Sequence, residues 1–145
     1  MVAGPNGAGK TTFYESYLSR TGLRFVNADR LALEFEVDAC LAAKLASRLR
    51  LALLESGQSF VLETVFSDPA GDKVAFLTKA VDVGYQVVLC FVGVSSWHMS
   101  EQRVDMRVSQ GGHDVPADKL EARFPRTLKN LRRSVVELPY VLVYD

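Results

Sequence analysis

The stretch Gly4-Pro5-Asn6-Gly7-Ala8-Gly9-Lys10-Thr11 decides the fold, because its spacing has a physical cause. Its glycines let successive backbone amides curl around a phosphate group without clashes from Cβ atoms. A helix that begins at Lys10 adds its own unpaired amides and the positive end of its dipole. A short apolar run precedes the stretch and a helical pattern follows it, which is the setting of a P-loop. The alternative interpretation is a glycine-rich turn with an accidental lysine.

The loop predicts a binding site for the phosphates of a nucleoside triphosphate. Lys10 is expected to reach the β- and γ-phosphate oxygens, and the Thr11 hydroxyl is expected to ligate Mg²⁺. The pattern does not say which molecule receives a phosphate. The predicted nucleotide-binding residues are Gly4, Asn6, Gly7, Ala8, Gly9, Lys10, Thr11 and Thr12.

Beyond the loop, apolar strand patterns alternate with helical patterns. This alternation is typical of parallel strands joined by helices that cover both faces of a sheet. It predicts an α/β fold, a three-layer sandwich around a parallel five-stranded sheet of the P-loop NTPase type. The predicted strands are residues 1–3, 24–27, 59–63, 85–94 and 140–144. The predicted helices are residues 10–19, 37–55 and 97–109, one that begins at Asp68-Pro69, and two stretches between Pro116 and Leu138 that Pro125 separates or kinks.

The 145 residues contain no linker, internal repeat or low-complexity segment, which predicts a single domain over residues 1–145. Only three residues precede the glycine-rich loop and the sequence stops on a strand pattern, so a chain shortened at both ends is expected. No signal peptide, lipidation motif or transmembrane run is visible. These absences predict a cytoplasmic protein without a membrane partner.

Charge and cysteine content narrow the range of partners. The net charge is zero, but residues 101–133 carry eight Lys and Arg against five Asp and Glu. This local excess suits an anionic ligand and is too small for a nucleic-acid surface, so no nucleic-acid partner is expected. Cys40 and Cys90 lack metal-ligand spacing, which favours free thiols in a reducing compartment.

Two other classes of P-loop protein are tested by their own signatures. GTPases read guanine with an Asn-Lys-x-Asp element, which this sequence lacks. Transporter-type ATPases carry Leu-Ser-Gly-Gly-Gln shortly before a strand that ends in Asp-Glu. The run Ser109-Gln110-Gly111-Gly112 imitates that signature, but Val108 occupies the leucine position and the spacing to the last strand is too long.

Carboxylates follow two of the predicted strands, where ligands of such sheets collect. Asp29 follows the strand at 24–27 and is the candidate general base for an acceptor hydroxyl. It also fits the cap of a helix, and both roles are compatible. Arg30 either holds the acceptor or faces solvent. Glu63 and Thr64 close the next strand, where Glu63 either bonds substrate hydroxyls and magnesium-bound water or serves as a structural cap.

Arginines gather in a segment that resembles a lid, over about residues 103–126. Arg103 and Arg107 share a helical face, and Arg123 and Arg126 follow a hinge that contains two glycines and His113. Such a lid is expected to close on the γ-phosphate and neutralise the charge that develops in transfer. Any single arginine is as well explained as a solvated surface charge. His113 is a candidate for orienting the lid by hydrogen bonding.

Taken together, these segments resemble the zeta-toxin-like P-loop kinases. The resemblance covers nearly the whole chain, and the combination of the phosphate loop with the Gly-Gly-His-x-Val-Pro segment is fairly specific to a branch of small zeta-like proteins. The matching segments are residues 4–13, 27–29, 60–64, 107–116 and 123–131.

The resemblance implies an adenylate-kinase-like sheet, Mg²⁺-ATP as the donor, and a hydroxyl of a UDP-amino sugar as the acceptor. The family's base corresponds to Asp29, its substrate-binding glutamate to Glu63, and its phosphate-contacting arginines to Arg107 and Arg123. An antitoxin protein is a partner that only the resemblance implies.

The leading hypothesis is an ATP-dependent small-molecule kinase with Lys10, Asp29, Arg107 and Arg123 as catalytic residues. One alternative is a P-loop ATPase or nucleotide-dependent switch, which needs no acceptor. Another is a degenerate paralogue that binds nucleotide without turnover.

Overall fold

A computed structural model of the chain describes residues 1–109, 111 and 114–145. Its centre is a five-stranded sheet in the order β2-β3-β1-β4-β5, and every strand pair in it is parallel. This confirms the predicted fold class. The strand at 85–94 is shorter than predicted, and the others agree to within a residue. The strands are β1 Val2–Ala3, β2 Arg24–Val26, β3 Phe60–Thr64, β4 Val88–Val92 and β5 Tyr140–Tyr144.

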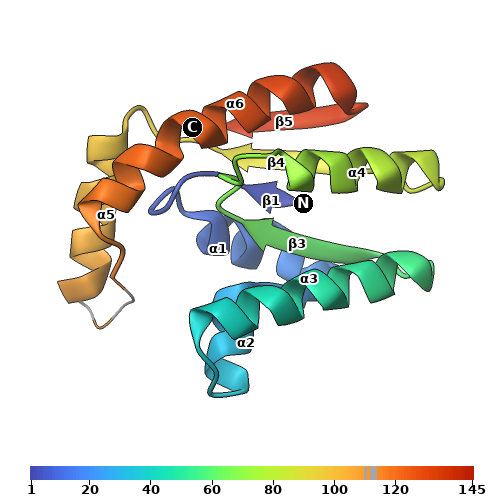
Figure 1. Cartoon of the computed structure of the whole chain (residues 1–145), viewed down its shortest axis with the longest axis horizontal. Coiled ribbons are helices and arrows are strands. Elements are labelled where there is room, and N and C mark those ends of the chain that lie inside the picture. The colour runs from blue at the N-terminus through green and yellow to red at the C-terminus, as the bar shows by residue number, and fades with distance from the viewer. Residues whose placement is uncertain (110, 112–113) are drawn as a thin grey trace.

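Helices cover both faces of the sheet and give the molecule three layers. Helices α3, α4 and α6 lie over one face, α1 lies behind the other, and α5 lies at one end of the strands (Figure 1). No helix in the described ranges is both long and apolar enough to cross a membrane. The helices are α1 Lys10–Phe13, η1 Tyr14–Leu18, η2 Ser19–Thr21, α2 Ala28–Glu34, α3 Ala39–Glu55, α4 Asp72–Asp82, α5 Trp97–Ser109 and α6 Ala117–Glu137.

Three helices differ from the sequence expectation. The first helical segment changes to π-helical geometry at Tyr14 and to 3₁₀ geometry at Ser19, although a single α-helix was expected. Helix α4 begins at Asp72, not at Asp68-Pro69, because the Asp68 carboxylate accepts hydrogen bonds from the backbone and ammonium of Lys73. Helix α6 runs through Pro125 without ending there.

Apolar residues fill the space on both sides of the sheet. The larger core lies between the sheet and the layer of α3, α4 and α6, and includes the fully buried Leu89, Phe66 and Val74. A smaller core packs Val2 and Val92 against α1 and η1. The two cores fix the sheet between the helix layers, so that the strand ends are held at set positions.

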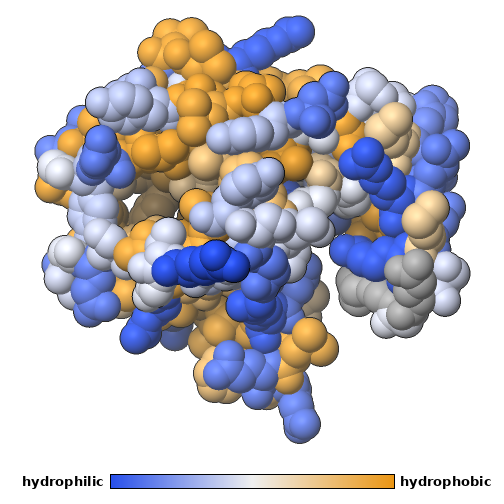
Figure 2. Space-filling view, turned by 180° about the vertical axis from the view of Figure 1, so that it is seen from behind, coloured by the Kyte–Doolittle hydropathy of each residue, from blue (hydrophilic) through white to orange (hydrophobic). Residues whose placement is uncertain are grey.

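On the face of the sheet that α1 covers, part of the sheet is not covered by a helix. Hydrophobic side chains gather over β4 and β5 on this side (Figure 2), where Tyr140, Leu142 and Tyr144 are partly exposed. An apolar cavity of about 580 Å³ lies beside them, with Phe13 and Leu18 from the helical side. This cavity contains none of the predicted site residues.

Helix α6 is fastened to the loop after β3 by buried polar side chains. Asn130 donates two hydrogen bonds from Nδ2, to the carbonyl of Phe66 at 2.9 Å and to that of Asp68 at 3.0 Å. The hydroxyl of Thr127 donates to the carbonyl of Val65 at 3.2 Å. Phe66 has a φ of 67°, a left-handed conformation that is rare for a bulky residue. The clamp from α6 therefore holds a strained loop in place.

This clamp generates a stability prediction. Asn130→Ala should lower the free energy of unfolding by about 2–4 kcal/mol, because two carbonyl groups lose their donor and a small cavity opens. Urea unfolding followed by circular dichroism measures the change. Lys129→Ala, at the exposed neighbouring position, should stay within about 0.5 kcal/mol of the parent protein. Equal midpoints for the two variants would contradict the clamp.

Candidate functional site

The glycine-rich loop leaves the sheet at its centre. Strand β1 pairs with β3 on one side and with β4 on the other, so the chain order reverses at this point. In open parallel sheets, ligands bind beyond the carboxyl ends of the strands at such a reversal. The register pairs Val2 with Glu63 and Ala3 with Thr64, so the loop that starts at Gly4 begins beside the end of β3.

Two glycines let the loop approach its neighbours closely. A Cβ atom on Gly4 would lie 2.0 Å from the carbonyl oxygen of Val92, and Gly4 has a φ of 151°. A Cβ atom on Gly7, whose φ is 70°, would lie 2.8 Å from the carbonyl oxygen of Ser100 on α5. The loop is therefore in direct contact with both β4 and the helix that carries Arg103.

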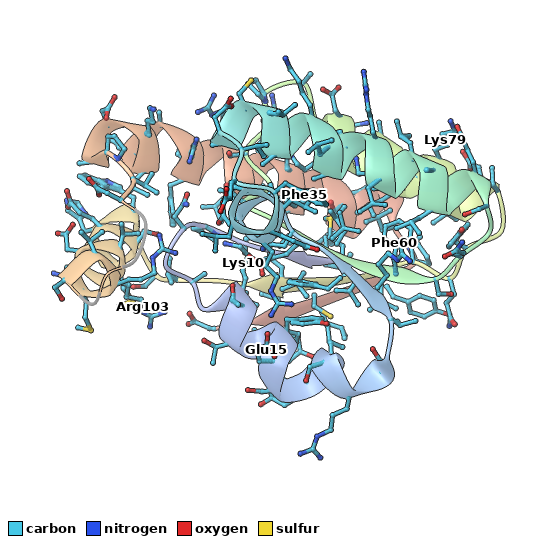
Figure 3. The ribbon with its side chains drawn as sticks, turned by 90° about the horizontal axis from the view of Figure 1, so that it is seen from below. Lys10, Glu15, Phe35, Phe60, Lys79 and Arg103 are labelled. Atoms are coloured by element: carbon cyan, nitrogen blue, oxygen red, sulfur yellow. The ribbon has the colours of Figure 1, made fainter. Side chains whose placement is uncertain are left out.

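Lys10 is buried at the end of this loop (Figure 3), and its Nζ donates a hydrogen bond to the carbonyl of Pro5 at 2.8 Å. The pKa of Lys10 is lowered to about 8, and burial is the largest cause. Within this net shift, the charges of Glu63 and Asp29 oppose the effect of burial and the charge of Arg107 adds to it. A buried ammonium group with a lowered pKa gains much from an anion that takes the place of lost water.

Asn27, not Asp29, caps the helix after β2. Its Oδ1 accepts a hydrogen bond from the amide of Arg30 at 2.8 Å. Asp29 lies in the first turn of α2 and lines the cleft described below. The alternative interpretation of Asp29 as the cap is therefore wrong. Its carboxylate is not used for capping, which leaves it available for chemistry.

Glu63 lies within hydrogen-bonding distance of the predicted metal ligand. The hydroxyl of Thr11 donates to Oε2 of Glu63 at 3.2 Å. In the described residues, no group of three or more His, Cys, Asp and Glu side chains forms a metal site by itself. Mg²⁺ prefers oxygen ligands and commonly takes one or two from the protein, with phosphate and water supplying the rest. The Thr11 and Glu63 pair fits that requirement.

Asn6 provides a separate test of the nucleotide site. Its Oδ1 is buried and has no hydrogen-bond partner in the part of the chain that the structure describes. Buried polar atoms are nearly always paired, so an unpaired one calls for an explanation such as a ligand or bound water. Asn6 lines the cleft together with Gly7 and Lys10. Because Oδ1 accepts hydrogen bonds, its missing partner is a donor, such as a water molecule or an amino or hydroxyl group of a ligand, and not a phosphate oxygen.

The cleft at the carboxyl end of the sheet has a volume of about 540 Å³. It brings together the phosphate loop, the ends of β2 and β3, and arginines from α5 and α6. The predicted residues that line it are Asn6, Gly7, Gly9, Lys10, Thr11, Thr12, Asp29, Glu63, Thr64, Arg103, Arg107 and Arg123.

The structure does not bring Arg30 into this cleft, although the sequence predicted it as substrate-binding. Its guanidinium forms an ion pair with Glu15 and lies over the rings of Phe25, at 4.9 Å, and Tyr14, at 5.7 Å. The two rings stack on each other with centroids 3.7 Å apart. Arg30 therefore ties α2 to η1 and β2. Since it follows Asp29 directly, it also anchors the turn that carries Asp29.

Among the described residues, three other predicted ones are not among those that line the cleft. Gly4 and Ala8 shape the loop, and Ala8 is buried in the smaller core. Arg126 uses its Nε to bond the carbonyl of Ala122 at 2.9 Å, within its own helix. His113 lies outside the described residues.

Sequence reasoning missed several residues that line the cleft. Asn27 had a usable signal, since asparagine before a helical pattern is a common cap. Lys73 had none, because it reads as an ordinary lysine near the start of a helix. The missed residues are Asn27, Ala28, Ala39, Ala43, Val65, Phe66, Ser67, Lys73 and Val115.

Solved structures share this architecture. A chain in the structure of the Pnkp1/Rnl/Hen1 RNA repair complex superposes with a TM-score of 0.64 at 20% identity, over 91% of this chain and 44% of that one. A protein of Chloroflexus aurantiacus described as a kinase gives a TM-score of 0.60 at 19% identity, over 99% of this chain and 86% of that one. At these identities the likeness shows the fold alone, and this fold is of the P-loop NTPase type. No curated protein gives a significant sequence match.

The model of one family matches most of the sequence. It is that of the zeta toxin, and it covers residues 36–145. The match includes Glu63 and the arginines of α5 and α6, while the phosphate loop and Asp29 precede it. Together with the P-loop fold, it supports a kinase-like function for the chain. The chain belongs to the zeta toxin family.

Proposed function

We propose that this protein is a kinase that transfers the γ-phosphoryl group of ATP to a hydroxyl group of a small molecule. The observation that carries the proposal is the position of the Asp29 carboxylate, which lines the same cleft as Lys10. Asn27 caps the helix, so the Asp29 carboxylate is not used for that purpose. A base on one wall and a phosphate loop on the other are what a phosphoryl transfer to an alcohol requires.

In the proposed step, the acceptor oxygen attacks the γ-phosphorus and its proton passes to Asp29. The bond between that phosphorus and the bridging oxygen breaks, and ADP leaves with the bridging oxygen. Lys10, Arg107 and Arg123 line the cleft and counter the negative charge on the transferred group. Arg103, from the same face of α5 as Arg107, is a further candidate for this role.

Thr11 and Glu63 are the residues that would hold Mg²⁺. When bound, Mg²⁺ would neutralise part of the negative charge of the phosphate groups. Glu63 also lies at the end of β3 beside Thr64, which lets it bond an acceptor hydroxyl. Family membership supports a UDP-amino sugar as the first acceptor to test, with UDP-N-acetylglucosamine as the representative.

The role of Asp29 is tested with Asp29→Asn. Loss of the base should lower transfer of labelled phosphate to the acceptor by about 10²- to 10⁴-fold. The dissociation constant for Mg²⁺-ATP should change by less than about threefold, because Asn keeps the shape of the side chain. Transfer is measured with labelled ATP and UDP-N-acetylglucosamine, and ATP binding by calorimetry. Glu34→Gln, an exposed carboxylate at the end of the same helix, is the matched control.

Three results would contradict this assignment. Equal loss of ATP binding and transfer would mean that Asp29 supports the nucleotide site and not the acceptor. Release of free phosphate at a rate that Asp29→Asn leaves unchanged, with no labelled acceptor in a panel of sugars, nucleosides and alcohols, would indicate an ATPase or a switch. Neither labelled acceptor nor free phosphate would indicate a protein that binds nucleotide without turnover.

The lowered pKa of Lys10 generates a prediction about pH. Bound phosphate favours the charged form of Lys10, so binding raises its pKa above the value of about 8 in the free protein. Affinity for the nucleotide should therefore be constant just below that value. Above it, affinity should fall by up to about tenfold per pH unit, since binding must then take up a proton.

Calorimetry with a non-hydrolysable ATP analogue, between about pH 7.5 and 9.5, measures this slope. Buffers of different ionisation enthalpy report the proton uptake directly. Lys10→Met should bind weakly at every pH and show no such uptake. A flat affinity for the parent protein over the whole range would contradict the predicted linkage.

A further inference from the structure

Lys73 is a half-buried lysine of α4 that lines the polar cleft and has no role in the mechanism above. Its Nζ lies 3.3 Å from Oδ1 of Asp68, and its backbone amide donates to Oδ2 of the same carboxylate at 3.3 Å. The Asp68 carboxylate therefore binds both the backbone amide and the side-chain ammonium of Lys73. Only 23% of the Lys73 side chain and 14% of the Asp68 side chain are exposed, so solvent competes little with this pair.

The support behind Lys73 is itself fixed. Asp68 lies in the loop that Asn130 clamps, and its carbonyl is one of the two that Asn130 bonds. The neighbouring Phe66, with its left-handed backbone, is fully buried. Burial raises the pKa of Asp68, but Lys73 and the backbone hydrogen bonds outweigh that effect and hold the pKa below its ordinary value. Near neutral pH the ammonium of Lys73 thus stays opposite an ionised carboxylate.

The position of Lys73 differs from that of the other cations in the cleft. In the described lining there are five cationic side chains and two carboxylates. Lys10 belongs to the phosphate loop and the three arginines belong to α5 and α6, whereas Lys73 comes from α4. It follows the segment at 64–67, which lines the cleft directly after Glu63. Lys73 therefore reaches the cleft from the element that follows β3 and Glu63, and not from the elements that carry the phosphate loop or the arginines.

We propose that Lys73 binds a phosphate group of the acceptor and so selects phosphorylated acceptors over neutral ones. The inference rests on the proposed kinase function. An ammonium group has three donors, of which Asp68 takes one, so two remain for a ligand. Hydrogen bonds from an ammonium to a phosphate are about twice as strong as bonds between neutral groups. Asp68 and Asn130 act as positioning residues that set where the acceptor phosphate binds.

The test measures binding, with the phosphate loop already filled by a non-hydrolysable ATP analogue and Mg²⁺. Three probes share one sugar: UDP-N-acetylglucosamine, N-acetylglucosamine 1-phosphate and uncharged N-acetylglucosamine. Lys73→Gln should weaken binding of the two phosphorylated probes by about ten- to a hundredfold and leave the neutral sugar unchanged. Its affinity for the ATP analogue should equal that of the parent protein.

Lys79→Gln is the matched control, because Lys79 is an exposed lysine of the same helix. Lys79 lies at the end of the molecule opposite to Arg103 (Figure 3). The Lys79→Gln substitution removes the same charge as Lys73→Gln and should leave the affinities for all three sugar probes unchanged. If Lys73→Gln is too unstable to measure, the double variant Asp68→Asn/Lys73→Gln removes both charges and leaves no buried carboxylate unpaired. It should fold and show the same selective loss.

Three results would overturn the role of Lys73. These are unchanged binding of the phosphorylated probes by Lys73→Gln, an equal loss for the ATP analogue, and no binding of either phosphorylated probe by the parent protein. Because binding is measured without turnover, the outcome is independent of whether phosphate is transferred. Selective binding without transfer would support the role of Lys73 and contradict the kinase function. Transfer without selective binding would support the kinase function and contradict the role of Lys73.

Discussion

The two hydrogen bonds that Asn130 donates to the loop after β3 connect opposite walls of the cleft. On one side they hold the segment that includes Phe66 and supports Lys73. On the other side they fix α6, which brings Arg123 into the same cavity two turns earlier. Separating the helix from the loop would leave buried carbonyl groups without a donor, which costs free energy. Hydrogen bonds from one side chain to the main chain therefore fix α6 relative to the loop after β3.

Local patterns predicted the parts of the molecule that depend on local physics. The phosphate loop was recognisable because its glycines meet a steric requirement of the backbone, and the strands because apolar runs must be buried in a parallel sheet. Arg30 could not be placed, because its partners Glu15 and Tyr14 reach it only through the packing of η1 against β2. Lys73 was missed for the same reason, since its setting is created by Asp68 and by a helix that follows about fifty residues later.

For Asp29, too, local sequence predicted one part of its role and tertiary structure decided the other. Its place after a predicted strand was enough to mark it as a candidate base, but the sequence left its use as a helix cap open. The structure resolves that alternative through Asn27, whose amide oxygen takes the capping bond. Capping preferences of asparagine and aspartate are nearly equal, so sequence alone gives little basis for choosing between neighbouring positions. Three-dimensional geometry was needed to decide which of the two side chains remains available.

The close contact at Gly7 has a mechanical consequence. The phosphate loop and α5 meet with no side chain between them, since even a methyl group there would collide with the Ser100 carbonyl and the Cβ of Arg103. Because the two segments are in van der Waals contact, neither can move toward the other without displacing it. A shift of the loop toward α5 must push the helix, and with it Arg103 at the contact and Arg107 one turn further along. Occupancy of the loop and the position of those arginines are thus linked by steric exclusion alone, even before any charge is neutralised.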